Sequence, residues 1–197
     1  MVDTREQYGG LASLYLPIAI AIFVLVVVVF AVFLWRFRRE REPSRTSEHM
    51  TLELVWVGIV AAIVVVLVIA TFRVESRVDA VAPRPALAVH VEAAKWNWRF
   101  TYPDGRTREA ELVVPAGRTI RFDAVSLDVL HDFWVPDLRF QRQVWPDHTE
   151  RFDLVFPHPG RYQGVCAWFC GLRHQNMHFT VRAVDQAAFD RFLGGMR

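Results

Sequence analysis

Two long uncharged stretches stand out in the first third of the chain. Residues 11–35 and 54–72 carry no charged side chain and consist almost entirely of apolar residues. A helix needs about 20 consecutive apolar residues to cross the hydrocarbon core of a bilayer, and in lipid its backbone must satisfy its own hydrogen bonds. We therefore predict a transmembrane helical hairpin over 11–72, with its spans at 11–35 and 54–72.

The residues flanking these spans predict how the hairpin is oriented. The loop at 36–50 contains five arginines, and arginine-rich loops are retained in the cytoplasm. Residues 1–10 then form an outer N-terminal segment, and both termini lie on the periplasmic or extracellular side of a bacterial plasma membrane. Membrane lipid is the first partner that the sequence predicts.

A polar linker is predicted at 73–85, and from residue 86 onward short alternating stretches replace the long apolar runs. Alternation of apolar and polar residues is typical of half-buried strands. Seven strands are predicted, at 87–93, 95–102, 109–114, 119–124, 149–156, 161–165 and 178–184. Turn residues between several of them favour an antiparallel sandwich with Greek-key connections over 86–197. A short helix at 185–196, with Asp185 as its N-cap, is predicted to end the domain.

Composition changes this picture little. The chain has 197 residues and a formal net charge of +2, so its overall charge does not indicate a nucleic-acid partner. About 120 residues remain outside the apolar third, which is enough for one small domain with its own core.

Both cysteines of the chain lie in one short segment, as Cys166 and Cys170. His174 follows four residues after the second cysteine, and Met177 follows three residues later. Thiolate, imidazole and thioether are ligands that suit copper better than magnesium or calcium. Two thiolates in one loop indicate two bridged coppers, and the second imidazole that such a centre needs is best supplied by His131.

Each of these residues has a simpler explanation when it is taken alone. Two cysteines in an extracytoplasmic domain also form small disulfide loops. Met177 alone is more typical of core packing, and His131 alone of a hydrogen-bonded core histidine. The combined spacing of Cys166, Cys170, His174 and Met177 favours the metal site.

The same residues carry a resemblance to a known family. Cys166, Cys170, Gly171, His174 and Met177 match the loop C-x-x-x-C-G-x-x-H-x-x-M of cytochrome c oxidase subunit II, which holds the binuclear copper A centre. The segment 128–136, which reads DVLHDFWVP, resembles a second motif of that family. Leu172, Gln175 and Asn176 make the loop similar to that of the B-type oxidases. The resemblance covers nearly the whole chain and implies a cupredoxin-like fold for the sandwich.

The resemblance also implies a ligand set. It makes Cys166 and Cys170 the bridging thiolates, His131 and His174 the two imidazole ligands, and Met177 a weak ligand. The last ligand in the family is a backbone carbonyl, here that of Trp168. The family usually has glutamate or glutamine at this position, and in A-type enzymes the glutamate also binds magnesium. Trp168 keeps the carbonyl but cannot bind magnesium, and Gln141 and Gln143 replace nearby charged residues, so we expect no magnesium site.

Trp96 resembles the tryptophan through which electrons reach the copper in this family. Strand alternation would instead place Trp96 in a core stripe with Trp98 and Phe100, and the sequence leaves both interpretations open. The neighbourhood is basic, which suggests a donor cytochrome less basic than usual. The basic residues are Lys95, Arg99, Arg106 and Arg108.

Glu53 lies at the start of the second span, three residues before Trp56. It is similar to the glutamate at the mouth of the K proton channel in A-type oxidases. The simpler interpretation is a solvated carboxylate in the first turn of a helix, where the helix dipole favours it. Four further histidines have no partner pattern and are expected to be structural or surface residues: His90, His148, His158 and His178.

The resemblance implies the second subunit of a haem-copper oxidase. Such a subunit takes electrons from a cytochrome c and passes them to haem in subunit I, where oxygen is reduced to water, and further membrane subunits are expected. The chain itself would then transfer electrons without catalysing oxygen reduction. Two alternatives stay open: the second subunit of a copper A-type nitric oxide reductase, and a membrane-anchored copper carrier or assembly protein.

Overall fold

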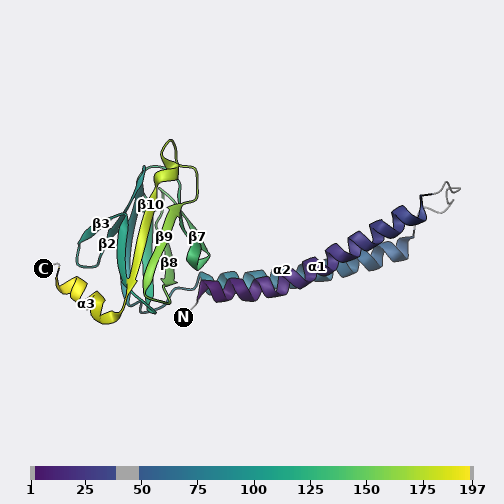
Figure 1. The fold of residues 1–197 in the computed structure, drawn as a ribbon, viewed down its shortest axis with the longest axis horizontal. Helices are drawn as coiled ribbons and strands as arrows, with labels where there is room; N and C mark the ends of the chain where they lie inside the picture. The colour runs from purple at the N-terminus through teal and green to yellow at the C-terminus, as the bar shows by residue number, and fades with distance from the viewer. Residues whose placement is uncertain (1–2, 39–48, 196–197) are drawn as a thin grey trace. The chain divides into compact units, whose positions relative to one another are not determined.

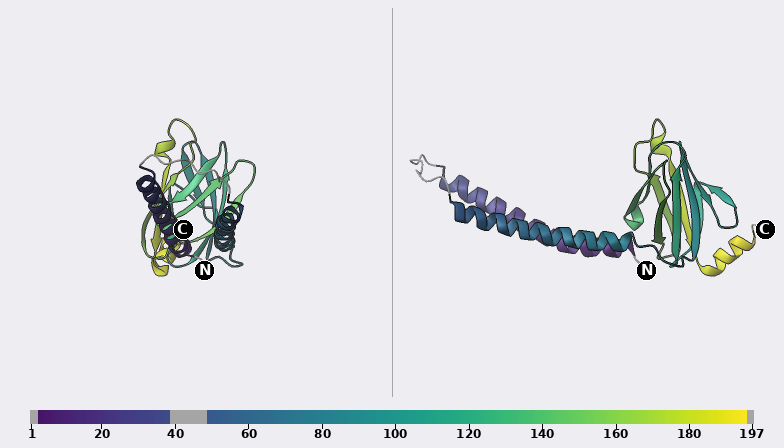
Figure 2. Two further views of the ribbon diagram at one scale, coloured as in Figure 1. Left: turned by 90° about the vertical axis from the view of Figure 1, so that its right-hand side faces the viewer. Right: turned by 180° about the vertical axis from the view of Figure 1, so that it is seen from behind.

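A computed structural model describes residues 3–38 and 49–195 of the chain. It contains two compact units, one formed by residues 9–76 and the other by residues 77–197 together with residues 1–8. The first is a helical hairpin and the second a β-sandwich (Figures 1 and 2). Each unit is described by itself.

The hairpin consists of α1 (Thr4–Arg36) and α2 (Met50–Val78), which run antiparallel (Figure 1). Both helices are long and apolar enough to cross a membrane, and none of the side chains in their most apolar stretches is buried within the protein. The hydroxyl of Tyr15 lies 2.6 Å from the Thr71 hydroxyl, which links the two helices. This arrangement fits a lipid environment, in which apolar side chains point outward.

Both helices extend beyond the predicted apolar spans. α1 begins at Thr4 rather than at residue 11, and α2 continues to Val78, so the first residues of the predicted linker 73–85 are helical. The added segments contain Glu, Gln and Arg, which favour helix, and hydropathy marks only the lipid-compatible part of a helix. Most of the predicted cytoplasmic loop at 36–50 lies outside the described residues.

Ten strands form two five-stranded sheets that face each other (Figure 2). The first sheet has the strand order β3-β2-β1-β5-β8 and the second the order β4-β10-β9-β6-β7. The strands of the first sheet are β1 (Leu87–Ala94), β2 (Asn97–Thr101), β3 (Thr107–Glu109), β5 (Thr119–Ser126) and β8 (Glu150–Val155). Those of the second are β4 (Glu111–Pro115), β6 (His131–Val135), β7 (Phe140–Val144), β9 (Gly160–Cys166) and β10 (His178–Val184).

The sandwich differs from the predicted one in three ways. β1 pairs with β5 and β4 with β10 in parallel, so the expectation of a purely antiparallel sandwich is wrong for these pairs. The predicted strand 109–114 is divided at Ala110, whose φ of 54° ends β3 and starts β4 in the opposite sheet. β6 and β7 were not predicted, because β6 has no alternating pattern: four of its five residues are buried.

Aromatic rings fill the space between the sheets beneath one end of the sandwich. Trp98 packs edge-on against Phe133 and Phe179, with ring centroids 5.6 and 5.3 Å apart. The Trp98 ring also lies 6.2 Å from the imidazole of His131. Edge-to-face aromatic packing fixes side-chain positions as well as burying area. The core therefore supports the candidate metal site from below.

The opposite end of the sandwich carries the short helix α3 (Gln186–Gly194; Figure 1). Asp185 is its N-cap, and its carboxylate accepts a hydrogen bond of 2.7 Å from the backbone N–H of Ala188. Phe189 is buried against the domain and Leu193 is half-buried. The predicted N-cap of this helix is confirmed, and the helix ends at Gly194 within the predicted range.

Candidate metal centre

The candidate ligands come from three neighbouring segments of the second sheet. His131 is the first residue of β6 and Cys166 is the last residue of β9, and the register places Cys166 opposite Phe133. The loop after Cys166 returns to start β10, and it is closed by a hydrogen bond of 3.0 Å from the Cys166 N–H to the Met177 carbonyl. Strand pairing therefore joins His131, which is 35 positions away in sequence, to the cysteine loop.

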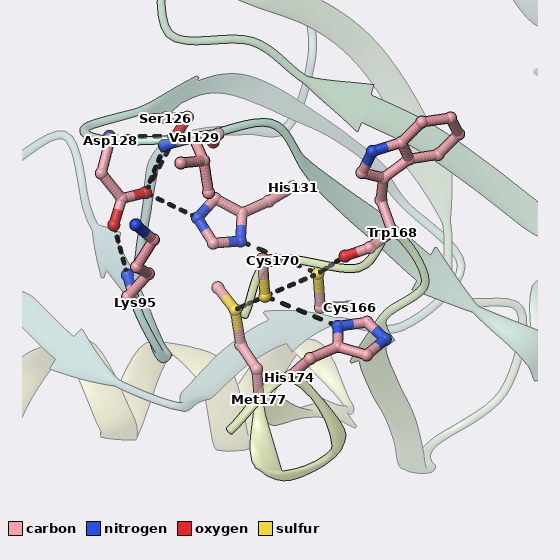
Figure 3. A network of polar contacts seen from close by, with 10 residues as sticks. All are labelled: Lys95, Ser126, Asp128, Val129, His131, Cys166, Trp168, Cys170, His174 and Met177. Atoms are coloured by element: carbon pink, nitrogen blue, oxygen red, sulfur yellow. Dashed lines mark hydrogen bonds and ion pairs between the residues drawn. The ribbon is translucent and has the colours of Figure 1, made fainter. Parts of the chain in front are cut away.

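Figure 3 shows how the side chains meet around the two sulfurs. The Sγ atoms of Cys166 and Cys170 lie 3.8 Å apart. Cys166 Sγ lies 3.7 Å from His131 Nδ1, and Cys170 Sγ lies 3.5 Å from His174 Nδ1. Met177 Sδ is 3.8 Å from Cys170 Sγ. Each sulfur thus has its own imidazole, and the thioether lies on the side of Cys170.

Burial and hydrogen bonds set the ionisation of these groups before any metal binds. Burial favours the neutral thiol of Cys166, but the adjacent His131 imidazole favours its thiolate, and its pKa lies below the ordinary value. Burial and the neighbouring Cys166 charge raise the pKa of Cys170 to about 12. One thiolate therefore forms readily, and the second requires the charge of a metal ion.

Asp128 positions the buried imidazole. Its Oδ1 lies 2.8 Å from His131 Nε2 and accepts the N–H of Val129 at 2.6 Å, while its Oδ2 accepts the N–H of Lys95 at 2.8 Å. A carboxylate on Nε2 favours the tautomer with its proton there, which leaves Nδ1 free to bind a metal. Asp128 was not among the predicted site residues, although a carboxylate three residues before the histidine is a local signal for this role.

Other residues of the cysteine loop supply a backbone carbonyl and shape the backbone around the two sulfurs. The backbone carbonyl of Trp168 lies 3.3 Å from Cys166 Sγ, on the side of the loop that faces the sulfurs. Gly171 has a φ of 117°, which favours glycine, and a Cβ built there would lie 3.4 Å from the Trp96 ring. His174 begins a 3-10 turn, His174–Asn176, that leads back to buried Met177.

Trp96 lies beside the centre rather than in the core stripe. Trp98 and Phe100 are fully buried, but Trp96 precedes β2, is half-buried and contacts Gly171 of the cysteine loop. The guanidinium of Arg173 stacks over its ring at 5.8 Å from the centroid. The aromatic ring is thus placed between solvent and the loop, and its role in accepting electrons remains a prediction.

The basic residues near Trp96 are largely neutralised. Arg99 pairs with Glu92 and Glu109, Arg106 with Asp104, and Arg108 with Glu111. Paired guanidinium groups attract a distant partner weakly. The expectation of a basic neighbourhood does not hold for these three arginines, because acidic residues two to ten positions away in the sequence pair with them in the folded domain.

The remaining candidate residues lie apart from the centre. Glu53 is exposed in the first turn of α2, in the other unit, and its role in proton uptake stays a prediction. Gln141 donates a hydrogen bond of 2.6 Å to the buried carboxylate of Asp132. The expectation that no magnesium binds beside Trp168 also stays a prediction.

The donor set fits copper. Among the described residues, His131, Cys166 and Cys170 form one group with ligand atoms within 4.8 Å of one another. Both cysteines are free, with their sulfurs on the same side of the loop and an imidazole nitrogen directed at each (Figure 3). Soft sulfur with imidazole selects copper over hard oxygen-seeking cations. The alternative of a disulfide loop leaves the two imidazoles and Met177 unexplained.

A hairpin long enough to cross a membrane, followed by a β-sandwich with a thiolate, imidazole and thioether cluster at one end, defines a membrane-anchored protein with an external metal-binding domain. Comparison with known proteins gives the family. Residues 4–74 match the family model "Cytochrome C oxidase subunit II, transmembrane domain", and residues 106–184 match "Cytochrome C oxidase subunit II, periplasmic domain". The chain belongs to the cytochrome c oxidase subunit II family.

Individual relatives agree with this assignment. The cytochrome c oxidase subunit 2 of Bacillus sp. strain PS3 is 30% identical over 169 residues, which cover 79% of this chain and 48% of the relative. The probable cytochrome c oxidase subunit 2 of Streptomyces avermitilis is 27% identical, with 77% of this chain and 61% of the relative covered. The chain therefore spans roughly half to three-fifths of the length of these relatives.

A solved structure confirms the fold of the external domain. The periplasmic domain of subunit II of cytochrome oxidase from Bradyrhizobium japonicum superposes with a TM-score of 0.55 at 22% sequence identity. The match covers 58% of this chain and 96% of that domain. The predicted cupredoxin-like sandwich behind a two-helix membrane anchor is confirmed.

Proposed function

We propose that the external domain holds a binuclear copper A centre and serves as the electron-accepting part of a haem-copper oxidase. Electrons would arrive from a c-type cytochrome and leave to haem in a catalytic partner subunit, which reduces oxygen to water. One observation carries the proposal: the two cysteine sulfurs lie 3.8 Å apart, and each faces the Nδ1 atom of a different histidine. A single metal would leave one thiolate–imidazole pair without a function.

Each residue of the centre would supply a different donor atom to the metal. Cys166 and Cys170 supply the shared sulfurs, His131 and His174 the two imidazole nitrogens, and Met177 a weak thioether. The carbonyl of Trp168 supplies the last donor. When bound, two coppers held by these groups would supply a one-electron redox centre whose charge is shared by both metals, so that adding or removing one electron would require little change of geometry.

The surrounding protein keeps these groups in place and excludes water. His131 and Met177 have no exposed surface, and the two cysteines are at most 5% exposed. A buried site with a fixed geometry lowers the cost of rearrangement on electron transfer. Trp96, in contact with the loop and half-buried, lies where an electron could enter from a docked donor.

Copper content and EPR spectra of the purified full chain test the proposal. We expect two coppers per chain with one electron delocalised over both, and loss of this spectrum in Cys166→Ser. One localised copper would favour the copper-carrier alternative, and a Cys166–Cys170 disulfide without copper would contradict the proposal. Trp96→Ala should slow electron uptake from a reduced cytochrome while leaving the copper spectrum unchanged.

The final electron acceptor of the complex and the orientation of the chain in the membrane need separate measurements. Oxygen consumption by the complex purified from membranes would support the oxidase, whereas turnover of nitric oxide alone would support the reductase alternative. We propose that both termini and the copper domain face the outer side, with the loop at 36–50 in the cytoplasm. A cysteine introduced in that loop should react with a membrane-impermeant thiol reagent only after the cells are opened.

A further inference from the structure

A cavity of about 270 Å³ lies within the sandwich unit, which includes residues 1–8 as well as residues 77–197. Its walls come from the first turn of α1, the end of α2 with the linker that follows, and the strands β5 and β8. None of the candidate metal ligands lines it. Most of the lining is apolar and consists of Val78, Ala80, Val81, Ala82, Pro83 and Val155.

Hydrogen bonds between distant segments hold the walls of this cavity. The hydroxyl of Thr4 donates a hydrogen bond of 2.6 Å to the carbonyl of Leu138, which fixes the start of α1. The N–H of Ala82 donates one of 2.6 Å to Asp153, whose carboxylate also pairs with Arg121 at 2.9 Å. The polar groups of these walls are thus satisfied by one another, and what the cavity offers a ligand is apolar surface.

The lining residues at the helix ends lie close to the lipid headgroups. Val78 is six residues beyond Phe72, the last residue of the apolar span in α2, which is about 9 Å along the helix. Thr4 is seven residues before the apolar span of α1 begins, which is about 10 Å. The headgroup layer on each side of a bilayer is about 5 to 8 Å thick. Both helices therefore place the cavity at the outer edge of that layer, within reach of a lipid.

Unpaired positive charge adjoins the lining. Four exposed arginines are each adjacent in the sequence to a lining residue, and within the described residues none of them forms an ion pair: Arg5, Arg77, Arg84 and Arg118. The carboxylates that line or adjoin the cavity each have a partner: Asp153 pairs with Arg121, Asp79 with Arg142, and Asp3 accepts the backbone N–H of Arg5. Arginine binds phosphate oxygens through two parallel N–H donors, and basic residues beside a membrane attract anionic lipids.

We propose that this cavity binds one anionic phospholipid from the leaflet on the side of the sandwich. The apolar lining holds part of an acyl chain, since 270 Å³ corresponds to roughly nine groups of the size of a water molecule. The adjoining arginines hold the phosphate of the headgroup. The site depends on the membrane anchor and not on copper, so this proposal and the proposed function can fail separately.

The first test removes charge. The full chain is purified in detergent, freed of lipid and titrated with phosphatidylglycerol or with phosphatidylcholine of the same acyl chains, and bound lipid is counted by native mass spectrometry. Arg77→Gln/Arg84→Gln removes two of the adjoining arginines. Arg161→Gln/Arg191→Gln is the control, because both residues are exposed, form no ion pair within the described chain and adjoin no lining residue.

We expect the wild-type and control chains to bind phosphatidylglycerol at least about tenfold more tightly than phosphatidylcholine. The Arg77→Gln/Arg84→Gln chain should bind the two lipids about equally, because the interaction with the extra negative charge is lost.

The second test fills the cavity. Ala80→Phe enlarges an exposed lining side chain, and Ala187→Phe, which changes an exposed alanine of α3, is its control. We expect Ala80→Phe to weaken the binding of both lipids at least about tenfold and Ala187→Phe to leave it unchanged. Equal far-UV circular dichroism spectra and unfolding midpoints of all the chains would show that the variants are folded.

Other results would overturn the proposal. Equal binding of the two lipids by the wild-type chain would show that the arginines do not recognise the headgroup. Undiminished lipid binding by Ala80→Phe would place the lipid outside the cavity, and if that variant also lost its partner subunits, the cavity would hold a protein segment. Displacement of phosphatidylglycerol by an equal concentration of inorganic phosphate would make the arginines a site for free anions.

Discussion

The two halves of the metal centre are held in different ways. His131 and Cys166 lie at the ends of β6 and β9, which are hydrogen-bonded to each other, and both side chains are almost completely buried. Cys170, His174 and Met177 come from a loop whose regular structure is one 3-10 turn. We name these the strand half and the loop half of the centre.

The hydrogen bonds of the two imidazoles show the same contrast. Nε2 of His131 is bound by Asp128, whereas among the described residues Nε2 of His174 has no partner. The sheet therefore positions the strand half before a metal binds, and the loop half depends more on the metal for its order. A single site can therefore be partly formed by the fold and partly completed when the metal binds.

Removing either thiolate should have the largest effect, because it breaks the bridge that joins the two halves. Cys166→Ser and Cys170→Ser are both expected to abolish the delocalised EPR spectrum and to leave at most one copper per chain. Metal analysis together with EPR checks this outcome. A delocalised spectrum that survives in either variant would show that the sulfurs do not bridge.

Replacing the two histidines one at a time compares the strand half with the loop half. Replacing either histidine with glycine should lower copper affinity by more than about 100-fold. This loss exceeds the roughly 10- to 100-fold loss that is usual when a residue hydrogen-bonded to a ligand is removed. Added imidazole should restore the spectrum of His174→Gly, whose site is half-exposed, and should not restore that of His131→Gly, whose site is sealed. Equal rescue of both variants would contradict the difference between the halves.

Asp128 tests how far the strand half depends on the hydrogen bond to His131. Asp128→Asn keeps the shape of the side chain but removes the charge beside His131, and we expect copper affinity to fall about 10- to 100-fold. Competition with a chelator measures the loss. Asp147→Asn is the control and should leave the affinity unchanged, since within the described residues Asp147 pairs only with exposed His148.

The smallest effect concerns stability. Burial raises the pKa of Asp132, whose Oδ1 atom lacks a hydrogen-bond partner. A carboxyl whose pKa is raised by folding contributes stability at low pH and loses it as the pH rises through that pKa. Asp132→Asn should therefore stabilise the copper-free chain by about 1 kcal/mol at neutral pH.

The Asp132→Asn gain should shrink in acid, as Asp132 becomes protonated first in the folded and then in the unfolded chain. Denaturant unfolding at two pH values measures the change. A gain that is equal at pH 4 and pH 7, or a loss at pH 7, would show that burial does not govern this carboxyl.

Much of the protein followed from residues that are close together in the sequence. Uncharged runs at 11–35 and 54–72 predicted helices because lipid permits little else, and the spacing of Cys166, Cys170, His174 and Met177 indicated a metal loop because one short loop can close around one site. Alternation predicted most strands, and Asp185 predicted the last helix.

The tertiary structure decided what depends on residues that are far apart in the sequence. The pairing of β6 with β9 brings His131 to Cys166, which is 35 positions away in the sequence. The strand pattern of β6 was hidden, because four of its five residues are buried and they include the charged Asp132. Local patterns record the chemistry of a residue and its neighbours, whereas contacts between distant segments exist only once the chain has folded.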